Sequence, residues 1–160
     1  METGAASRRR RPDGLAAGRA VPEPLEYLAG AWELDRVVAD ELAGVEGRFV
    51  GSATFERVGA TSLVYREAGE LELPGYRGRA TRSYRYVADE GRRVRVEFED
   101  GRDFHDAELL VEGFATVHLC GGDRYEGRYA LVSDRCWTLE WRVTGPATSL
   151  RLLSRFDRAR

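Results

Sequence analysis

Residues 114–132 read FATVHLCGGDRYEGRYALV, two alternating segments on either side of Gly121-Gly122. Alternation of apolar and polar residues is typical of a half-buried strand, and a two-residue glycine turn joins such strands into a hairpin. The same pattern continues in both directions along the chain, with short segments separated by Gly, Asp and Pro. We predict one helical turn at 24–28 and strands at 31–39, 48–57, 62–73, 77–87, 93–99, 104–111, 114–120, 123–132, 136–143 and 149–157.

These segments predict an all-β fold. Ten short strands leave no room for crossover helices, so we expect an antiparallel up-and-down meander. Free strand edges promote aggregation, and closure into a barrel removes them. A chain of 160 residues with 42% hydrophobic content suits one domain. We place this barrel domain at residues 25–160 and expect residues 1–24, rich in Arg, Ala and Pro, to be a disordered tail.

Amino-acid composition narrows the chemistry. The sequence has no Lys, Asn, Gln or Ile, and all 25 basic residues are Arg. A bacterial genome of high G/C content explains this bias, because the codons for Lys, Asn and Ile are rich in A and T. Schiff-base chemistry on a lysine is excluded. The net charge is −2, which does not predict the basic face of a nucleic-acid-binding protein.

The cysteine content and the length of the apolar runs indicate the cellular compartment of the protein. Cys120 and Cys136 do not make a disulfide framework and are typical of free thiols in a reducing compartment. No apolar run has the length of a signal peptide or of a membrane helix. We therefore predict a cytoplasmic protein without a membrane partner.

Three motifs carry a resemblance to known families: LAGAW at 28–32, FEDGRDFH at 98–105 and HLCGGDRY at 118–125. Gly30-Ala31-Trp32 resembles the Gly-x-Trp opening of the calycin and lipocalin superfamily. That resemblance implies a barrel in which an arginine of the last strand, here Arg151 or Arg155, covers the tryptophan. Residues 28–158 are similar to a bacterial family, domain of unknown function 6314. This second resemblance implies the fold and no particular activity.

Hairpin register predicts which residues face one another. A two-residue turn at Gly121-Gly122 places Cys120 opposite Asp123, His118 opposite Tyr125 and Phe114 opposite Tyr129. A similar turn at Glu112-Gly113 would place His105 opposite Cys120 and Ala107 opposite His118. The other face of these strands carries Asp106, Glu108, Arg124, Glu126 and Arg128. We therefore expect the histidine face to be the barrel interior.

The Pro74-Gly75 turn defines another hairpin. It places Glu67 opposite Arg82, Tyr65 opposite Tyr84 and Leu63 opposite Tyr86, so Glu67 and Arg82 are a candidate buried ion pair. The facing of residues 136–143 stays open. Trp137, Leu139, Trp141 and Val143 form an apolar stripe typical of a core, whereas a tight turn at Ser133-Asp134 would place the same stripe outside.

A barrel interior of this composition favours binding of a small apolar or amphipathic molecule. Candidate ligand-binding residues are Tyr65, Glu67, Arg82, Tyr84, Cys120 and Tyr129. An alternative is an enzyme that performs acid–base chemistry, such as an isomerase, cyclase or dehydratase, for which the candidate catalytic residues are His118, Tyr125, Asp123 and His105.

Four other interpretations remain. His118, Cys120, His105 and Asp123 have the donor types that zinc prefers, and a single histidine could hold haem in a barrel. Cys120 beside an imidazole could act as a nucleophile. A barrel whose interior is filled by side chains would instead be an interaction module. No cofactor is assigned from the sequence.

Overall fold

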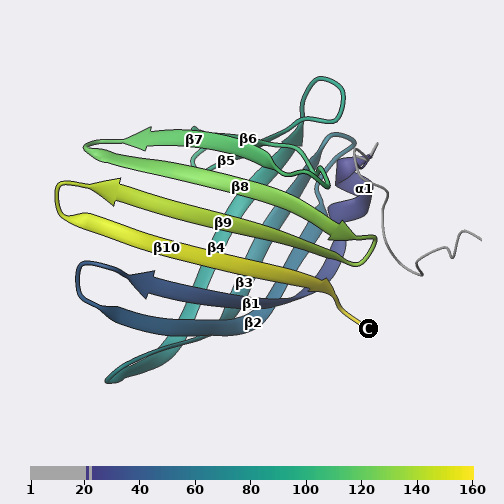
Figure 1. Cartoon of the computed structure of the whole chain (residues 1–160). Helices are drawn as coiled ribbons and strands as arrows, with labels where there is room; N and C mark the ends of the chain where they lie inside the picture. The colour runs from purple at the N-terminus through teal and green to yellow at the C-terminus, as the bar shows by residue number, and fades with distance from the viewer. Residues whose placement is uncertain (1–20, 22) are drawn as a thin grey trace, which may run out of the picture.

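Ten antiparallel strands and one short helix make up the part of the chain that the computed structural model describes, residue 21 and residues 23–160 (Figure 1). The tail predicted for residues 1–24 lies almost entirely outside that part. The elements are α1 (Pro24–Leu28), β1 (Gly30–Asp40), β2 (Val45–Arg57), β3 (Ser62–Leu73), β4 (Tyr76–Ala88), β5 (Val94–Glu97), β6 (Asp103–Ala107), β7 (Phe114–Cys120), β8 (Asp123–Ser133), β9 (Cys136–Gly145) and β10 (Thr148–Arg158). The predicted all-β meander is confirmed.

The sheet runs in the order β6-β5-β4-β3-β2-β1-β10-β9-β8-β7. β1 pairs with β10, so the first and last strands lie side by side in the middle of the sheet. The sheet curls until its two edge strands, β6 and β7, lie near one another, which produces a nearly closed barrel (Figure 1).

The hairpin predicted at Glu112-Gly113 is wrong. The ladders of the described residues pair β7 with β8 and join no residue of β6 to β7. After β6 the chain instead places the Leu110 carbonyl where it accepts hydrogen bonds from the N–H groups of Gly113, at 3.1 Å, and Leu131, at 2.9 Å. These bonds hold the connection against β8, so His105 does not lie opposite Cys120. We call the junction of β6 and β7 the seam.

The other predicted registers are confirmed. β7 and β8 pair His118 with Tyr125, and β3 and β4 pair Glu67 with Arg82. Along β8 and β9 the register shifts by one residue between Leu131 and Ser133. The turn itself consists of Asp134 and Arg135, one residue later than the turn considered at Ser133-Asp134. Because of the register shift, Trp137, Leu139, Trp141 and Val143 face inward, where all four are buried.

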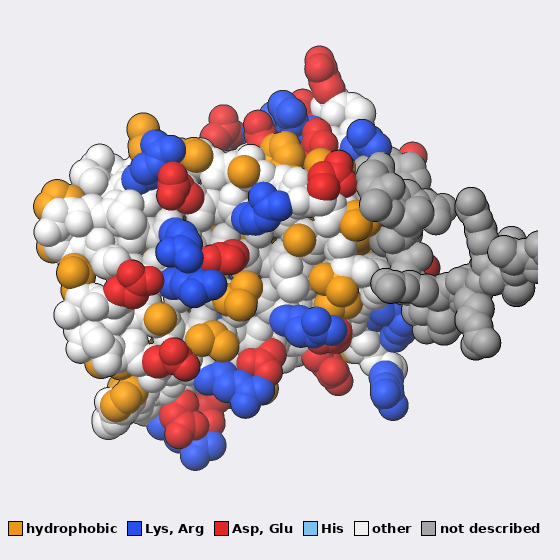
Figure 2. All heavy atoms as spheres, in the orientation of Figure 1, with side chains coloured by type: hydrophobic (Ala, Val, Ile, Leu, Met, Phe, Trp, Pro, Cys, Tyr) orange, Lys and Arg blue, Asp and Glu red, His pale blue; other side chains and the backbone are white. Residues whose placement is uncertain are grey.

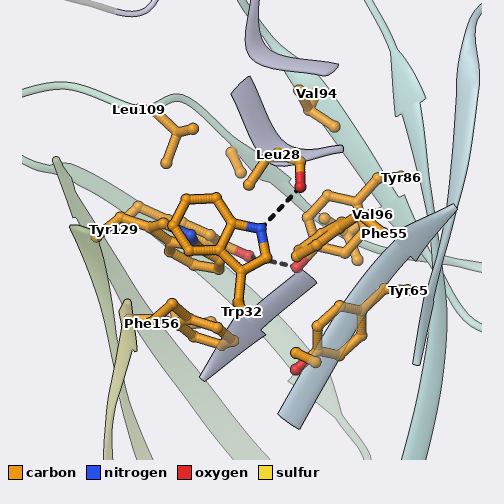
Figure 3. Close-up of a cluster of buried hydrophobic side chains, with 14 of the residues drawn as sticks. Leu28, Trp32, Phe55, Tyr65, Tyr86, Val94, Val96, Leu109, Tyr129 and Phe156 are labelled. Atoms are coloured by element: carbon orange, nitrogen blue, oxygen red, sulfur yellow. Dashed lines mark hydrogen bonds between the residues drawn. The ribbon is translucent and has the colours of Figure 1, made fainter. Parts of the chain in front are cut away.

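One end of the barrel is closed by α1 and Trp32. The Trp32 indole is fully buried and donates a hydrogen bond of 2.8 Å to the Leu28 carbonyl (Figure 3). Arg158, the last residue of β10, covers this ring at 4.0 Å from its centroid and donates to the carbonyls of Tyr27 and Ala29. Neither Arg151 nor Arg155 does so, because both point outward and bind Glu140 and Asp157.

The exterior carries charges of both signs mixed with scattered apolar side chains (Figure 2). Exposed ion pairs join neighbouring strands, as between Arg48 and Asp35 or Arg77 and Glu70. Such pairs contribute little each, but they keep the outer face polar. Among the described residues no helix has the length and apolarity that a membrane crossing requires.

Candidate functional site

A cavity of about 330 Å³ occupies the barrel interior on the side of the core away from Trp32. Its walls come from β1, β3, β4, β6–β10 and the loop between β5 and β6. The lining residues are Arg36, Tyr65, Glu67, Arg82, Tyr84, Tyr86, Phe98, Phe104, His105, His118, Cys120, Tyr125, Tyr129, Leu139, Trp141, Val143, Leu150, Leu152 and Phe156. The volume lies within the ~300–1,000 Å³ common for small-molecule sites.

One wall of the cavity is a continuous group of aromatic rings. Phe104 stacks on Trp141 with centroids 5.3 Å apart and on Tyr84 at 5.4 Å, while Phe98 stacks on Phe104 at 4.6 Å. The Trp141 ring has this position because Gly127, opposite it on β8, has no side chain: a Cβ there would lie 2.6 Å from the ring. The wall therefore depends on a glycine as well as on the rings.

The most buried polar group of the site is an ion pair. Arg36 on β1 donates two parallel hydrogen bonds, of 2.7 and 2.8 Å, to the Glu67 carboxylate on β3. On the intervening strand β2, Ala53 lies opposite Glu67 and Phe49 lies opposite Arg36, whose guanidinium is 5.3 Å from the centroid of the Phe49 ring. The Tyr65 hydroxyl also donates to Glu67, and the Arg36 Nε donates to Ser154.

This ion pair corrects the predicted partner of Glu67. Arg82 lies opposite Glu67 in the ladder, but its side chain is exposed and makes no ion pair with the described residues. Arg36, which the sequence analysis did not name, takes that role. A period-two pattern on β1 could have found it, because Trp32, Leu34 and Arg36 share one face and the first two are buried.

For both Arg36 and Glu67, the attraction between the two charges favours the ionised form more than burial opposes it. Burial opposes ionisation of Glu67, but the hydrogen bonds and positive charge of Arg36 hold the pKa of this carboxyl below its usual value. Burial likewise opposes the charge on Arg36, yet Glu67 raises the pKa of the guanidinium. Burial and the neighbouring carboxylate raise the pKa of Tyr65 well above its usual value. All three groups therefore keep one protonation state near neutral pH.

His105 is buried and neutral. Burial lowers the pKa of its imidazole from 6.5 to about 4, despite a hydrogen bond with the Asp106 carbonyl at 3.2 Å. Since a carbonyl only accepts, this bond places the proton on Nδ1. The ring packs between Phe104, at 4.5 Å, and Trp141, at 4.8 Å. Both Phe104 and His105 face inward because the β5–β6 register shifts next to them.

The remaining predicted residues divide into two groups. His118 and Tyr125 line the cavity as direct cross-strand neighbours, with ring centroids 5.9 Å apart, and Cys120 lines it with an exposed side chain. Asp123 does not line it. Its carboxylate lies over Gly145 and accepts a long hydrogen bond of 3.5 Å from Thr148, because the first residue after the tight turn is close to the β9–β10 turn.

The four residues considered as alternative zinc ligands are not brought together. In residues 21 and 23–160, no three His, Cys, Asp or Glu side chains are grouped so as to hold a metal ion. Asp123 turns away from the cavity and His105 is enclosed by aromatic rings. Cys136 is buried apart from this site, and burial raises the pKa of its thiol to about 11.

The fold and the cavity define a small antiparallel barrel with an aromatic interior site. The chain belongs to the Family of unknown function (DUF6314), which it matches over residues 28–158. No curated protein matches it.

Similar solved structures share the barrel. One is the S-type phycobiliprotein lyase CPES from Guillardia theta, with 12% identity, a TM-score of 0.63, and coverage of 85% of this chain and 90% of that chain. Another is the redesigned β barrel mFAP1 bound to DFHBI, with 13% identity, a TM-score of 0.47, and coverage of 85% and 99%. At these identities the likeness to the lyase is one of fold.

Proposed function

We propose that the protein binds a small, flat, largely apolar molecule inside the barrel. The observation that carries this proposal is the cavity of about 330 Å³, whose wall of stacked aromatic rings is interrupted by a few fixed polar groups. A barrel that only supported its own fold would fill this space with side chains, since protein interiors are close-packed.

The arrangement of the walls favours a planar ring system. Phe104 lies nearly parallel to Trp141, with an interplanar angle of 17°, and Tyr84 lies within 29° of Phe104. Flat faces in similar orientations offer stacking contact to another ring, which adds to the free energy of apolar burial. The polar groups then set the orientation of the molecule.

Binding of the neutral naphthalene dye prodan tests this proposal. The wild-type protein is expected to shift the dye emission to shorter wavelength, as an apolar enclosed site does. Leu152→Trp should abolish the shift, because Leu152 lines the cavity and a larger ring fills it. Leu153→Trp is the matched control, since Leu153 is the next residue of β10 and points outward, 40% exposed. An unshifted dye with wild-type protein contradicts the proposal.

A second candidate function is proton transfer by His118. It is favoured by one observation, the direct opposition of His118 and Tyr125 on the cavity wall. An imidazole and a phenol are side chains that general acid–base catalysis uses. The test is exchange of deuterium from solvent into the α-carbon of tetralone. His118→Ala should abolish exchange and leave prodan binding intact; equal exchange by the wild type and the variant removes this candidate.

A further inference from the structure

The charges that face the cavity are unequal. Among the described lining residues, Glu67 is the single acid, while Arg36 and Arg82 are both cationic. Arg36 and Glu67 neutralise one another through two hydrogen bonds. The His105 imidazole is uncharged near neutral pH because burial lowers its pKa to about 4. The two arginines of the lining therefore outnumber its single acid, and Arg82 is the arginine that makes no ion pair among the described residues.

The charged groups of the lining also have more capacity to donate hydrogen bonds to a ligand than to accept them. Both oxygens of Glu67 are already occupied, by the two Arg36 nitrogens and the Tyr65 hydroxyl. The carboxylate therefore has little capacity left for a ligand that donates hydrogen bonds or carries positive charge. The guanidinium of Arg82, by contrast, has five donors in a planar fork and no acid within ion-pair distance among the described residues.

Arg82 stands next to the aromatic wall. It shares the inner face of β4 with Tyr84, two residues further on, which corresponds to about 7 Å along a strand. Tyr84 lies between Tyr65, with centroids 6.0 Å apart, and Phe104. The Arg82 side chain is exposed although it lines the cavity, so it lies where the cavity meets solvent.

From this juxtaposition we infer that the ligand is an aromatic carboxylate. Its rings lie against the Tyr84–Phe104 part of the wall and its carboxylate meets the guanidinium of Arg82 at the opening. This inference rests on the proposed function and adds the charge of the ligand to it. The two parallel N–H groups of an arginine match the two oxygens of a carboxylate, and a charged acceptor roughly doubles the strength of each hydrogen bond.

The test compares three probes of one shape: naphthalene carboxylate, naphthalene carboxamide and naphthylmethylammonium. Each competes with prodan for the wild-type protein at neutral pH and low salt. We expect the carboxylate to bind about tenfold more tightly than the carboxamide, and the ammonium most weakly. Added salt should reduce the advantage of the carboxylate, because Arg82 is exposed and its charge is screened.

Two variants test whether Arg82 causes the preference for the carboxylate over the carboxamide. Arg82→Gln should make the carboxylate and the carboxamide equally effective competitors of prodan. Arg79→Gln is the matched control, because Arg79 is an exposed arginine on the same strand whose side chain lies on the other face. It should preserve the tenfold preference.

The outcomes separate the two proposals. Equal binding of carboxylate and carboxamide by the wild type, or tighter binding of the ammonium, overturns the inference and leaves the binding function in place. Persistence of the preference in Arg82→Gln also overturns it. Absence of binding for all three probes and for prodan overturns the inference together with the proposed function.

Discussion

Arg36 and Glu67 form a two-pronged ion pair across an intervening strand, with both side chains at most 10% exposed. Taking two charges out of water is costly, so the pair is weak evidence for high stability. Each partner is nevertheless required by the other, since removal of one leaves a buried charge without compensation.

Arg36→Met is therefore expected to lower the free energy of unfolding by about 3–5 kcal/mol. The double variant Arg36→Met/Glu67→Leu should be more stable than Arg36→Met, because it removes the orphaned carboxylate as well. Urea unfolding followed by tryptophan fluorescence measures both. Arg48→Met is the control: its ion pair with Asp35 is exposed, and its loss should cost about 0–1 kcal/mol. A double variant less stable than Arg36→Met would contradict this account.

His105 makes stability depend on pH in a defined window. Its pKa falls from 6.5 in the unfolded chain to about 4 in the folded protein, so between these values the unfolded chain binds a proton that the folded protein does not. The stability that the neutral His105 imidazole contributes to the folded protein is fully present above pH 6.5, and it is lost as the pH falls toward 4. It amounts to about 3 kcal/mol at most.

Replacement by phenylalanine removes this titration and fits the aromatic surroundings. We expect His105→Phe to flatten the plot of unfolding free energy against pH between 6.5 and 4, relative to the wild type. Urea titrations at half-unit steps of pH provide the measurement. An unchanged slope would mean that His105 titrates alike in both states.

Arg158 connects the last strand to the closed end of the barrel. Arg158→Met should lower the free energy of unfolding by about 1–3 kcal/mol, because the carbonyls of Tyr27 and Ala29 lose their donor and Trp32 loses the guanidinium above it. Arg158→Lys should restore little of it, since an ammonium lacks the planar guanidinium that covers the indole while it donates to both carbonyls. Arg155→Met, at an exposed ion pair, should have little effect, and equal losses in both would refute the assignment.

Gly127 controls the position of the Trp141 ring. In Gly127→Ala the added methyl group would lie 2.6 Å from this ring, so the indole must move into the cavity or the strands must separate. We expect a loss of about 1–3 kcal/mol, a changed near-ultraviolet circular dichroism spectrum and weaker prodan binding. Gly59→Ala, where the nearest atom is 3.8 Å away, should change none of the three.

The strands could be predicted from the sequence because each segment alternates and each turn has a glycine, proline or aspartate. Their registers followed for the two hairpins that turn at Gly121-Gly122 and Pro74-Gly75. Three features made the prediction of facing residues from hairpin register fail. Irregularities in β6 and β8 turn Phe104 and the apolar stripe of β9 inward, and the β6–β7 connection binds β8 instead of forming a hairpin. A register shift of one residue moves the side chains of a strand to the opposite face of the sheet, and the local sequence pattern does not indicate such a shift.

The lining of the cavity could be predicted in part for the same reason. Residues near the regular hairpins, His118, Tyr125, Tyr65 and Tyr84, do line the cavity. Partners that come from strands distant in the chain could not be deduced by pairing neighbours. The ion pair of Arg36 with Glu67 skips a strand, and the arginine above Trp32 comes from the last residue of β10.

The pairing of β1 with β10 determines the order in which the barrel can fold during synthesis. Hairpins such as β3–β4 join neighbours and can pair while the chain is still being made, whereas Trp32 must wait for Arg158. Contacts between such distant positions form slowly, because a large loop has to close first. Until β10 has been synthesised, β1 and β9 both present an unpaired edge, and the cavity lacks the wall that Leu150, Leu152 and Phe156 provide. The cavity is therefore among the last parts of this domain to be completed during synthesis.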